Sequence, residues 1–90
     1  MEFIWVFCGV GSKFPCGVFT DKSIAEDCIK SKNLSGILTK YPLDIDVYSW
    51  TINKKFFNPK SEHEFKAEFI QKFSSGYQEH YHYENGENED

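Results

Sequence analysis

Two histidines and a glutamate near the end of the chain have a spacing that suits a shared metal ion. His80, His82 and Glu84 alternate with tyrosines in the segment 76–84. Successive side chains of a β-strand point to opposite faces, so these three side chains would share one face. Imidazole and carboxylate groups are ligands for zinc and for non-haem iron. The pattern predicts a candidate metal site, and His63 of an expected helix is the residue that a second element could add to it.

The same residues allow two other interpretations. His80 and His82 could act as general acid and general base, as in metal-free cleavage of RNA. The sequence contains no arginine and places no lysine beside them, so charge developing in such a transition state has no assigned partner. The simplest interpretation is a pair of imidazoles on a solvated sheet face. A small enzyme or metal-binding domain that uses His80, His82 and Glu84 is therefore the alternative function.

A second set of residues combines acids with aromatic rings. It consists of Tyr41, Asp44, Asp46, Tyr48 and Trp50. Aromatic side chains within a polar rim are typical of protein–protein interfaces, so this set predicts a partner-binding surface. The alternatives are that Tyr48 and Trp50 belong to the core, and that the two acids start a helix or lie at a solvated edge.

The other side of the expected strand over residues 77–83 is aromatic. Tyr77, Tyr81 and Tyr83 share that side with Glu79 and need a layer to pack against. A carboxylate among these rings conflicts with burial. We therefore expect Glu79 to lie at the sheet edge or to pair with a lysine.

Aromatic and β-branched runs predict three further strands. They cover residues 3–8, 16–19 and 37–41, and Pro42 ends the last of them. The run over 3–8 is apolar throughout, which is typical of a strand covered on both faces or nearly so. A glycine loop joins the first two strands, so we expect an antiparallel hairpin.

Two helices have identifiable ends. Thr20 is a suitable N-cap for an amphipathic helix that runs to about residue 32, with Leu34 folding back after its end. Ser61 and Glu64 have the spacing of a capping box. The phenylalanines that follow them form an apolar stripe, which predicts a continuous helix over residues 62–73.

The segment 43–52 is ambiguous. Its apolar residues alternate as in a strand, but Asp44 or Asp46 could cap a short helix that ends in lysines. An acidic start and a basic end both match the helix dipole, so we favour the helix.

These elements predict an α+β fold. We expect a small, mostly antiparallel sheet of about four strands, with two or three helices packed on one face. Residues 1–84 would form a single globular domain. Nothing apolar remains to be buried after Glu84, so residues 85–90 are expected to be a disordered acidic tail.

Charge is concentrated at the C-terminal end of the chain. The formal net charge is -4, and Glu84, Glu87, Glu89 and Asp90 account for all of it, since the other ten acids balance the ten lysines. Without a basic excess and without arginine, nucleic-acid binding lacks its electrostatic footprint. We expect no nucleic-acid partner.

Cysteine usage and hydropathy bear on the compartment. Cys8, Cys16 and Cys28 are an odd set without a Cys-x-x-Cys pair, which is typical of reduced cytosolic thiols that behave as small hydrophobic residues. A Cys8–Cys16 bridge would need an oxidising environment. The chain starts without the pattern of a signal peptide, and no apolar run approaches the roughly 20 residues that cross a bilayer. We expect a soluble, cytoplasmic protein with no membrane partner, and the oligomeric state is left open.

Several strings of residues resemble a known family. They are Trp5-Val6-Phe7, Phe14-Pro15 with Gly17-Val18-Phe19, Ser35-Gly36 with Leu38-Thr39, Tyr41-Pro42-Leu43-Asp44, Val47-Tyr48 with Trp50, and Gln78-Glu79-His80-Tyr81-His82-Tyr83-Glu84. The chain is similar, from Trp5 to Gly86, to a family of small bacterial domains without an assigned activity. Cys16 stands where that family usually has a small residue such as serine, which argues against a required thiol there. The resemblance implies a single bacterial cytosolic domain and transfers no residue role.

The leading functional hypothesis is a non-catalytic protein-binding module without a cofactor. Its most concrete form is an immunity-type protein that neutralises a basic toxin domain. An acidic chain without a recognisable catalytic set motivates this hypothesis, because negative charge attracts a cationic partner.

Overall fold

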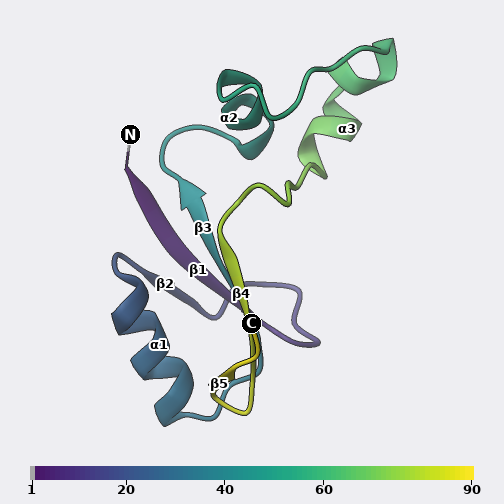
Figure 1. The fold of residues 1–90 in the computed structure, drawn as a ribbon. Coiled ribbons are helices and arrows are strands. Elements are labelled where there is room, and N and C mark those ends of the chain that lie inside the picture. Colours follow the sequence, from purple (N-terminus) through teal and green to yellow (C-terminus); the bar gives the residue numbers. More distant parts are fainter. Residues whose placement is uncertain (1) are drawn as a thin grey trace.

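The computed structural model describes residues 2–90, which fold into a five-stranded antiparallel sheet with helices at one face and one end (Figure 1). The sheet order is β2-β1-β3-β4-β5. The elements are β1 (Phe3–Gly9), β2 (Gly17–Phe19), α1 (Lys22–Ser31), β3 (Gly36–Pro42), α2 (Val47–Asn53), the 3-10 helix η1 (Glu62–Phe65), α3 (Ala67–Gln71), β4 (His80–Glu84) and β5 (Glu87–Asn88). The predicted α+β class is confirmed, with five strands in place of about four.

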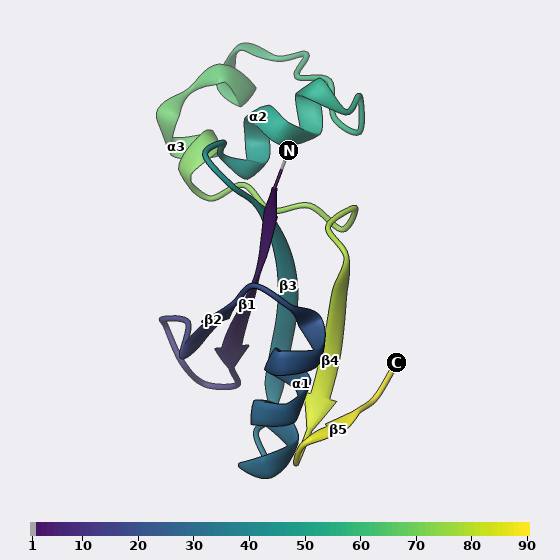
Figure 2. The ribbon, with the colours of Figure 1, turned by 90° about the vertical axis from the view of Figure 1, so that its left-hand side faces the viewer.

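The helices give the molecule an elongated shape of 45 × 28 × 21 Å. Helix α1 lies against one face of the sheet, and α2 and α3 stack beyond one end of it (Figure 2). The ring of Trp50 in α2 meets Phe3 of β1 edge to face, with centroids 6.4 Å apart. No helix among residues 2–90 is long and apolar enough to span a membrane.

The main core lies between α1 and the sheet. Six buried residues form it: Trp5, Phe7, Ala25, Ile29, Leu38 and Tyr83. The antiparallel register pairs Phe7 with Leu38, so alternate side chains of neighbouring strands reach the same side. Ala25 and Ile29 are four apart in α1 and therefore share its buried stripe. The core layer therefore combines alternate residues of the strands with residues four apart in the helix.

Helix α1 begins one residue later than the sequence predicted. Asp21, not Thr20, is the N-cap, and its Oδ1 accepts the backbone N–H of Ser23 at 3.2 Å. At the other end, Asn33 adopts a left-handed φ of 54°. The N–H of Leu34 then donates to the carbonyl of Ile29 at 2.9 Å, and its side chain packs on the core, as predicted.

The ambiguous segment 43–52 contains helix α2, which confirms the favoured prediction. Asp46 is the N-cap and accepts the N–H of Ser49 at 2.9 Å. Asp44 instead has a left-handed φ of 61° in the turn before the helix.

The continuous helix predicted over residues 62–73 is wrong. The capping box of Ser61 and Glu64 is present, but the chain is extended at Lys66, which separates η1 from α3. In a continuous helix the carbonyl of Glu64 would accept a backbone N–H from the next turn. Here the carbonyl of Glu64 accepts a hydrogen bond from the hydroxyl of Tyr48 at 2.7 Å. A buried side chain of α2 thus takes the place of the backbone N–H that a continuous helix would supply.

A second aromatic cluster holds these helices together. The ring of Tyr48 lies 5.9 Å from Phe57, 6.2 Å from Phe69 and 5.4 Å from Phe73 between centroids. These are favourable edge-to-face and tilted contacts. Two members of the predicted stripe, Phe69 and Phe73, thus pack on α2 together with Phe57, while Phe65 before the break is 59% exposed.

The sheet face away from α1 is uncovered, so β1 is not buried on both sides as predicted. Ile4 and Val6 are only partly buried and Cys8 is exposed. Cys16, beyond the glycine loop, is also exposed, which corrects the expectation of buried thiols for these two cysteines.

The prediction of a disordered tail over residues 85–90 is also wrong. Asn85 and Gly86 have left-handed φ values of 49° and 85°, and they turn the chain so that Glu87 pairs with Glu84. Two consecutive left-handed residues are typical of a type I′ hairpin turn, for which Asn-Gly is the preferred sequence. The N–H of Gly86 also donates to the carbonyl of Leu34 at 2.8 Å. Backbone pairing therefore orders a segment that has little to bury.

Two isoleucines of α1 test the position of the core. Ile29 is fully buried and Ile24 is 54% exposed. We expect Ile29→Ala to lower the free energy of unfolding by about 2–5 kcal/mol, because it leaves a cavity. The matched variant Ile24→Ala should change it by about 0.5 kcal/mol or less. Urea denaturation measures both, and equal losses would contradict this placement of α1.

Candidate functional site

The uncovered side of the sheet carries the sequence-predicted histidines, and we call it the open face. It consists of Ile4, Val6 and Cys8 of β1, Val18 of β2, Ile37, Thr39 and Tyr41 of β3, and His80, His82 and Glu84 of β4. The register places Ile37 beside Cys8 on one neighbouring strand and beside His82 on the other. The residues of most chemical interest thus lie at one edge of an apolar surface.

His80 and His82 are brought together as predicted. Their ring centroids are 5.5 Å apart, and both residues are exposed. The Nδ1 atom of His80 lies 2.7 Å from the backbone carbonyl oxygen of Gln78. The Nδ1 atom of His82 lies 3.2 Å from Oδ1 of Asp90. Each ring is therefore held at Nδ1 by an oxygen acceptor.

Asp90 is the site residue that the sequence interpretation missed. Its Oδ2 accepts the backbone N–H of His82, and its Oδ1 faces the ring of the same residue. The bond from the backbone N–H, followed by that from the ring, holds the pKa of Asp90 below its ordinary value. The Asn85–Gly86 pair was the available signal, because a hairpin turn there folds the following residues back onto β4.

Glu84 and His63 do not complete a metal site with the two histidines. Glu84 lies opposite Glu87 in the register. His63 belongs to η1, where its ring packs 5.1 Å from that of Phe69. Within the described part of the chain, residues 2–90, no group of three or more His, Cys, Asp or Glu residues could hold a metal ion.

The five residues predicted as an acidic aromatic surface are divided between core and solvent. Tyr48 and Trp50 are each only 7% exposed. They match the alternative interpretation, in which these rings belong to the core. Tyr41 is 36% exposed on the open face, and the side chains of Asp44 and Asp46 are exposed before α2. The rings and the acids therefore do not form one continuous surface.

Glu79 pairs with a lysine on the neighbouring strand. Its carboxylate lies 3.8 Å from Nζ of Lys40 and accepts the hydroxyl of Tyr81 at 2.5 Å. The hydrogen bond to the carboxylate raises the pKa of Tyr81 above its ordinary value. Pairing with a lysine, one of the two predicted outcomes, is confirmed.

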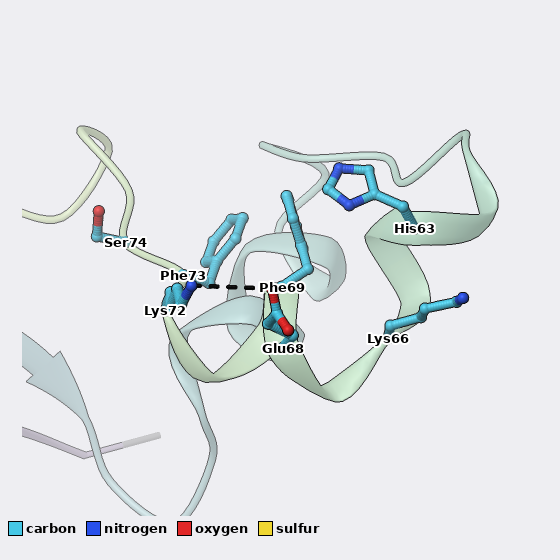
Figure 3. A pocket seen from close by; sticks show the side chains of 7 residues that line it. All are labelled: His63, Lys66, Glu68, Phe69, Lys72, Phe73 and Ser74. Carbon is cyan, nitrogen blue, oxygen red and sulfur yellow. Dashed lines mark ion pairs between the residues drawn. The ribbon is translucent and has the colours of Figure 1, made fainter.

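Two hollows of similar volume lie in different parts of the molecule. One, of about 480 Å³, is lined by Cys8, Ile37 and His82 of the open face, and the other lies in the helical part, away from the histidine pair. This second hollow has a volume of about 490 Å³. Figure 3 shows the side chains that line it, which come from η1, α3 and the residues beside them and include the rings of Phe69 and Phe73. The ammonium group of Lys66 points outward, and Lys72 pairs with Glu68 at 3.9 Å on the exposed surface. This lining has no nucleophile beside a base.

Asp46 provides a test of the local structure at the predicted surface. Asp46→Ala should lower the free energy of unfolding by about 0.5–2 kcal/mol, while Asp46→Asn, which can still accept the Ser49 N–H, should cost only a few tenths. That hydrogen bond lowers the pKa of Asp46, so its contribution is present above the unfolded-state pKa and is lost as the pH falls through the folded-state pKa. Thermal unfolding of both variants between pH 2 and 7 measures this, and equal losses in both would contradict a capping role.

Comparisons with known proteins identify the family. A family model described as a domain of unknown function (DUF7710) matches residues 4–89. A search of curated proteins finds no match. A search of solved structures finds none. Because the family match spans nearly the whole sequence, the chain belongs to the DUF7710 family of domains of unknown function.

Proposed function

We propose that this protein is a non-catalytic protein-binding module whose open face binds a partner with a basic and apolar surface. The observation that carries the proposal is an uncovered apolar sheet face beside a row of acids. The proposal moves the partner-binding surface from the predicted acidic aromatic set to the open face, with Tyr41 common to both.

The apolar part of the open face is continuous across three strands. Val18 is 61% exposed, Ile37 41% and Tyr41 36%. Val6 joins them, because it pairs with Val18 on one side and with Thr39 on the other. Single exposed apolar side chains are common, but a contiguous patch on a folded domain is typical of an interaction site.

The glycine loop extends this apolar surface. Val10 is 79% exposed and Phe14 is 75% exposed. The N–H of Val10 donates to the carbonyl of Ser35 at 2.9 Å, so the start of the loop is tied to the strand layer. Phe14 adds an exposed ring, and aromatic residues are enriched in protein interfaces.

The acidic residues beside the open face indicate that the partner is cationic. Glu84 and Glu87 are direct cross-strand neighbours, and like charges in that position destabilise a sheet. Glu89 and Asp90 follow directly after β5. A cationic partner would relieve this repulsion and would be steered toward the adjacent apolar face. We propose as the most concrete form an immunity-type role against a basic toxin domain.

The alternative of a small enzyme has less support from the geometry. General acid–base chemistry would need a cation or other donor for the developing charge. Apart from the two histidines, the ionisable side chain that β1, β3 and β4 place on the open face with a formal charge is the carboxylate of Glu84, and Lys40 lies on the opposite side, paired with Glu79.

Matched variants separate the apolar and charged parts of the proposed interface. The wild-type protein, immobilised at low salt, should capture a basic protein from the native host, identified by mass spectrometry and then produced for calorimetry. Val18→Ser with Ile37→Ser should weaken that binding roughly tenfold or more, because it removes apolar contact area. Glu84→Gln with Glu87→Gln should mainly slow association and reduce the dependence on salt.

Phe65→Ser is the control, because Phe65 is equally exposed but lies in η1. It should leave affinity unchanged. Capture of no basic protein at low salt, or equal weakening by Phe65→Ser and by the sheet variant, would overturn the proposal.

A further inference from the structure

We propose that His80 and His82 form a binding site for a divalent transition-metal ion, with Zn²⁺ as the ion that the geometry fits. The ion would be held by the Nε2 atoms of both rings. This site does not depend on the protein-binding function, because it rests on the two imidazoles and their oxygen partners.

The hydrogen bonds fix which nitrogen of each ring is available. A backbone carbonyl can only accept, so His80 must donate from Nδ1 to Gln78. The carboxylate of Asp90 also accepts, which assigns the proton of neutral His82 to Nδ1. In the neutral rings both Nε2 atoms therefore carry a lone pair, and neither has a hydrogen-bond partner among residues 2–90. A lone pair on Nε2 is what a metal ion requires.

The distance between the rings suits chelation. Zinc binds imidazole nitrogen at about 2.0–2.1 Å, so two rings on one tetrahedral ion have centroids about 5.2 Å apart. The observed separation is 5.5 Å. Both residues point to the same face because they are two apart in β4. Both side chains are exposed, so neighbouring residues leave room for the rings to turn their Nε2 atoms toward one ion.

The surroundings of the two rings are those of metal-binding histidines. Such histidines almost always donate the other ring N–H to a carboxylate or a backbone carbonyl, which orients the ring and raises its basicity. Asp90 supplies the first kind of partner and Gln78 the second. Glu84 and Glu87 add negative charge at the same edge of the sheet, which favours a cation.

This site differs from the ligand set that the sequence predicted. Glu84 was expected as the third ligand, but the structure gives Asp90 a role in holding His82 and leaves two protein ligands. Zinc is usually four-coordinate, so two positions remain for water or for a group from another molecule.

Titration calorimetry of the untagged protein with Zn²⁺ at neutral pH tests the site. We expect one ion per chain, and loss of this binding in the His80→Ala/His82→Ala variant. Asp90→Ala should weaken binding roughly tenfold or more, because it frees the ring of His82. NMR spectra should show the ring protons of these two histidines shifting on addition of zinc.

Two control variants make the result specific. His63→Ala should bind zinc as the wild type does, because His63 lies in η1. Glu84→Gln should change affinity only slightly, since Glu84 is not a ligand in this proposal. If the wild type binds zinc no more strongly than the double variant, or if either control loses binding, the proposed metal site is overturned. Because both rings are exposed, the double variant should fold as the wild type does. An unfolding curve of the double variant that differs from that of the wild type would reveal misfolding.

Discussion

One-sided burial of the central strands is the constraint on which the rest of this structure depends. Phe7 and Leu38 are neighbours in the register and are both buried under α1. Because strand side chains alternate, that burial fixes the opposite direction for Ile37 and for His82 beside it. A register shift of one residue would place the histidines in the core and Tyr83 in solvent. The hydrophobic packing of α1 therefore decides which residues the protein presents.

The same constraint explains what could be predicted from the sequence. The period-two pattern of residues 80–84 placed the histidines and the tyrosines on opposite faces, because burial enforces that period. Caps were readable where a side chain and a backbone group lie close in sequence, as at Ser61. The break at Lys66 could not be predicted from its neighbours, because the carbonyl of Glu64 accepts the hydroxyl of Tyr48, a residue that is distant in sequence. Burial of Trp50 against Phe3 likewise depends on how the helices stack.

The prediction for the C-terminal hairpin failed for a different reason. Composition predicted disorder over residues 85–90, since acids have little to bury. Backbone pairing with β4 and the left-handed turn at Asn85 order the segment instead. This matters for the site, because the turn brings Asp90 to His82. Both proposals use the resulting edge of the open face, one through its negative charge and the other through the orientation of its imidazole rings.

Solvent accessibility of side-chain methyl groups, measured by NMR with a soluble paramagnetic probe, tests one-sided burial most directly. Val18 and Ile37 are predicted to lose signal strongly, because they lie on the open face. Ile29 of α1 and Leu38 of β3, which are fully buried between the helix and the sheet, should be protected. Equal protection of Ile37 and Leu38 in the isolated chain would mean that both faces of the sheet are covered. That result would contradict the account, since the open face would then not exist.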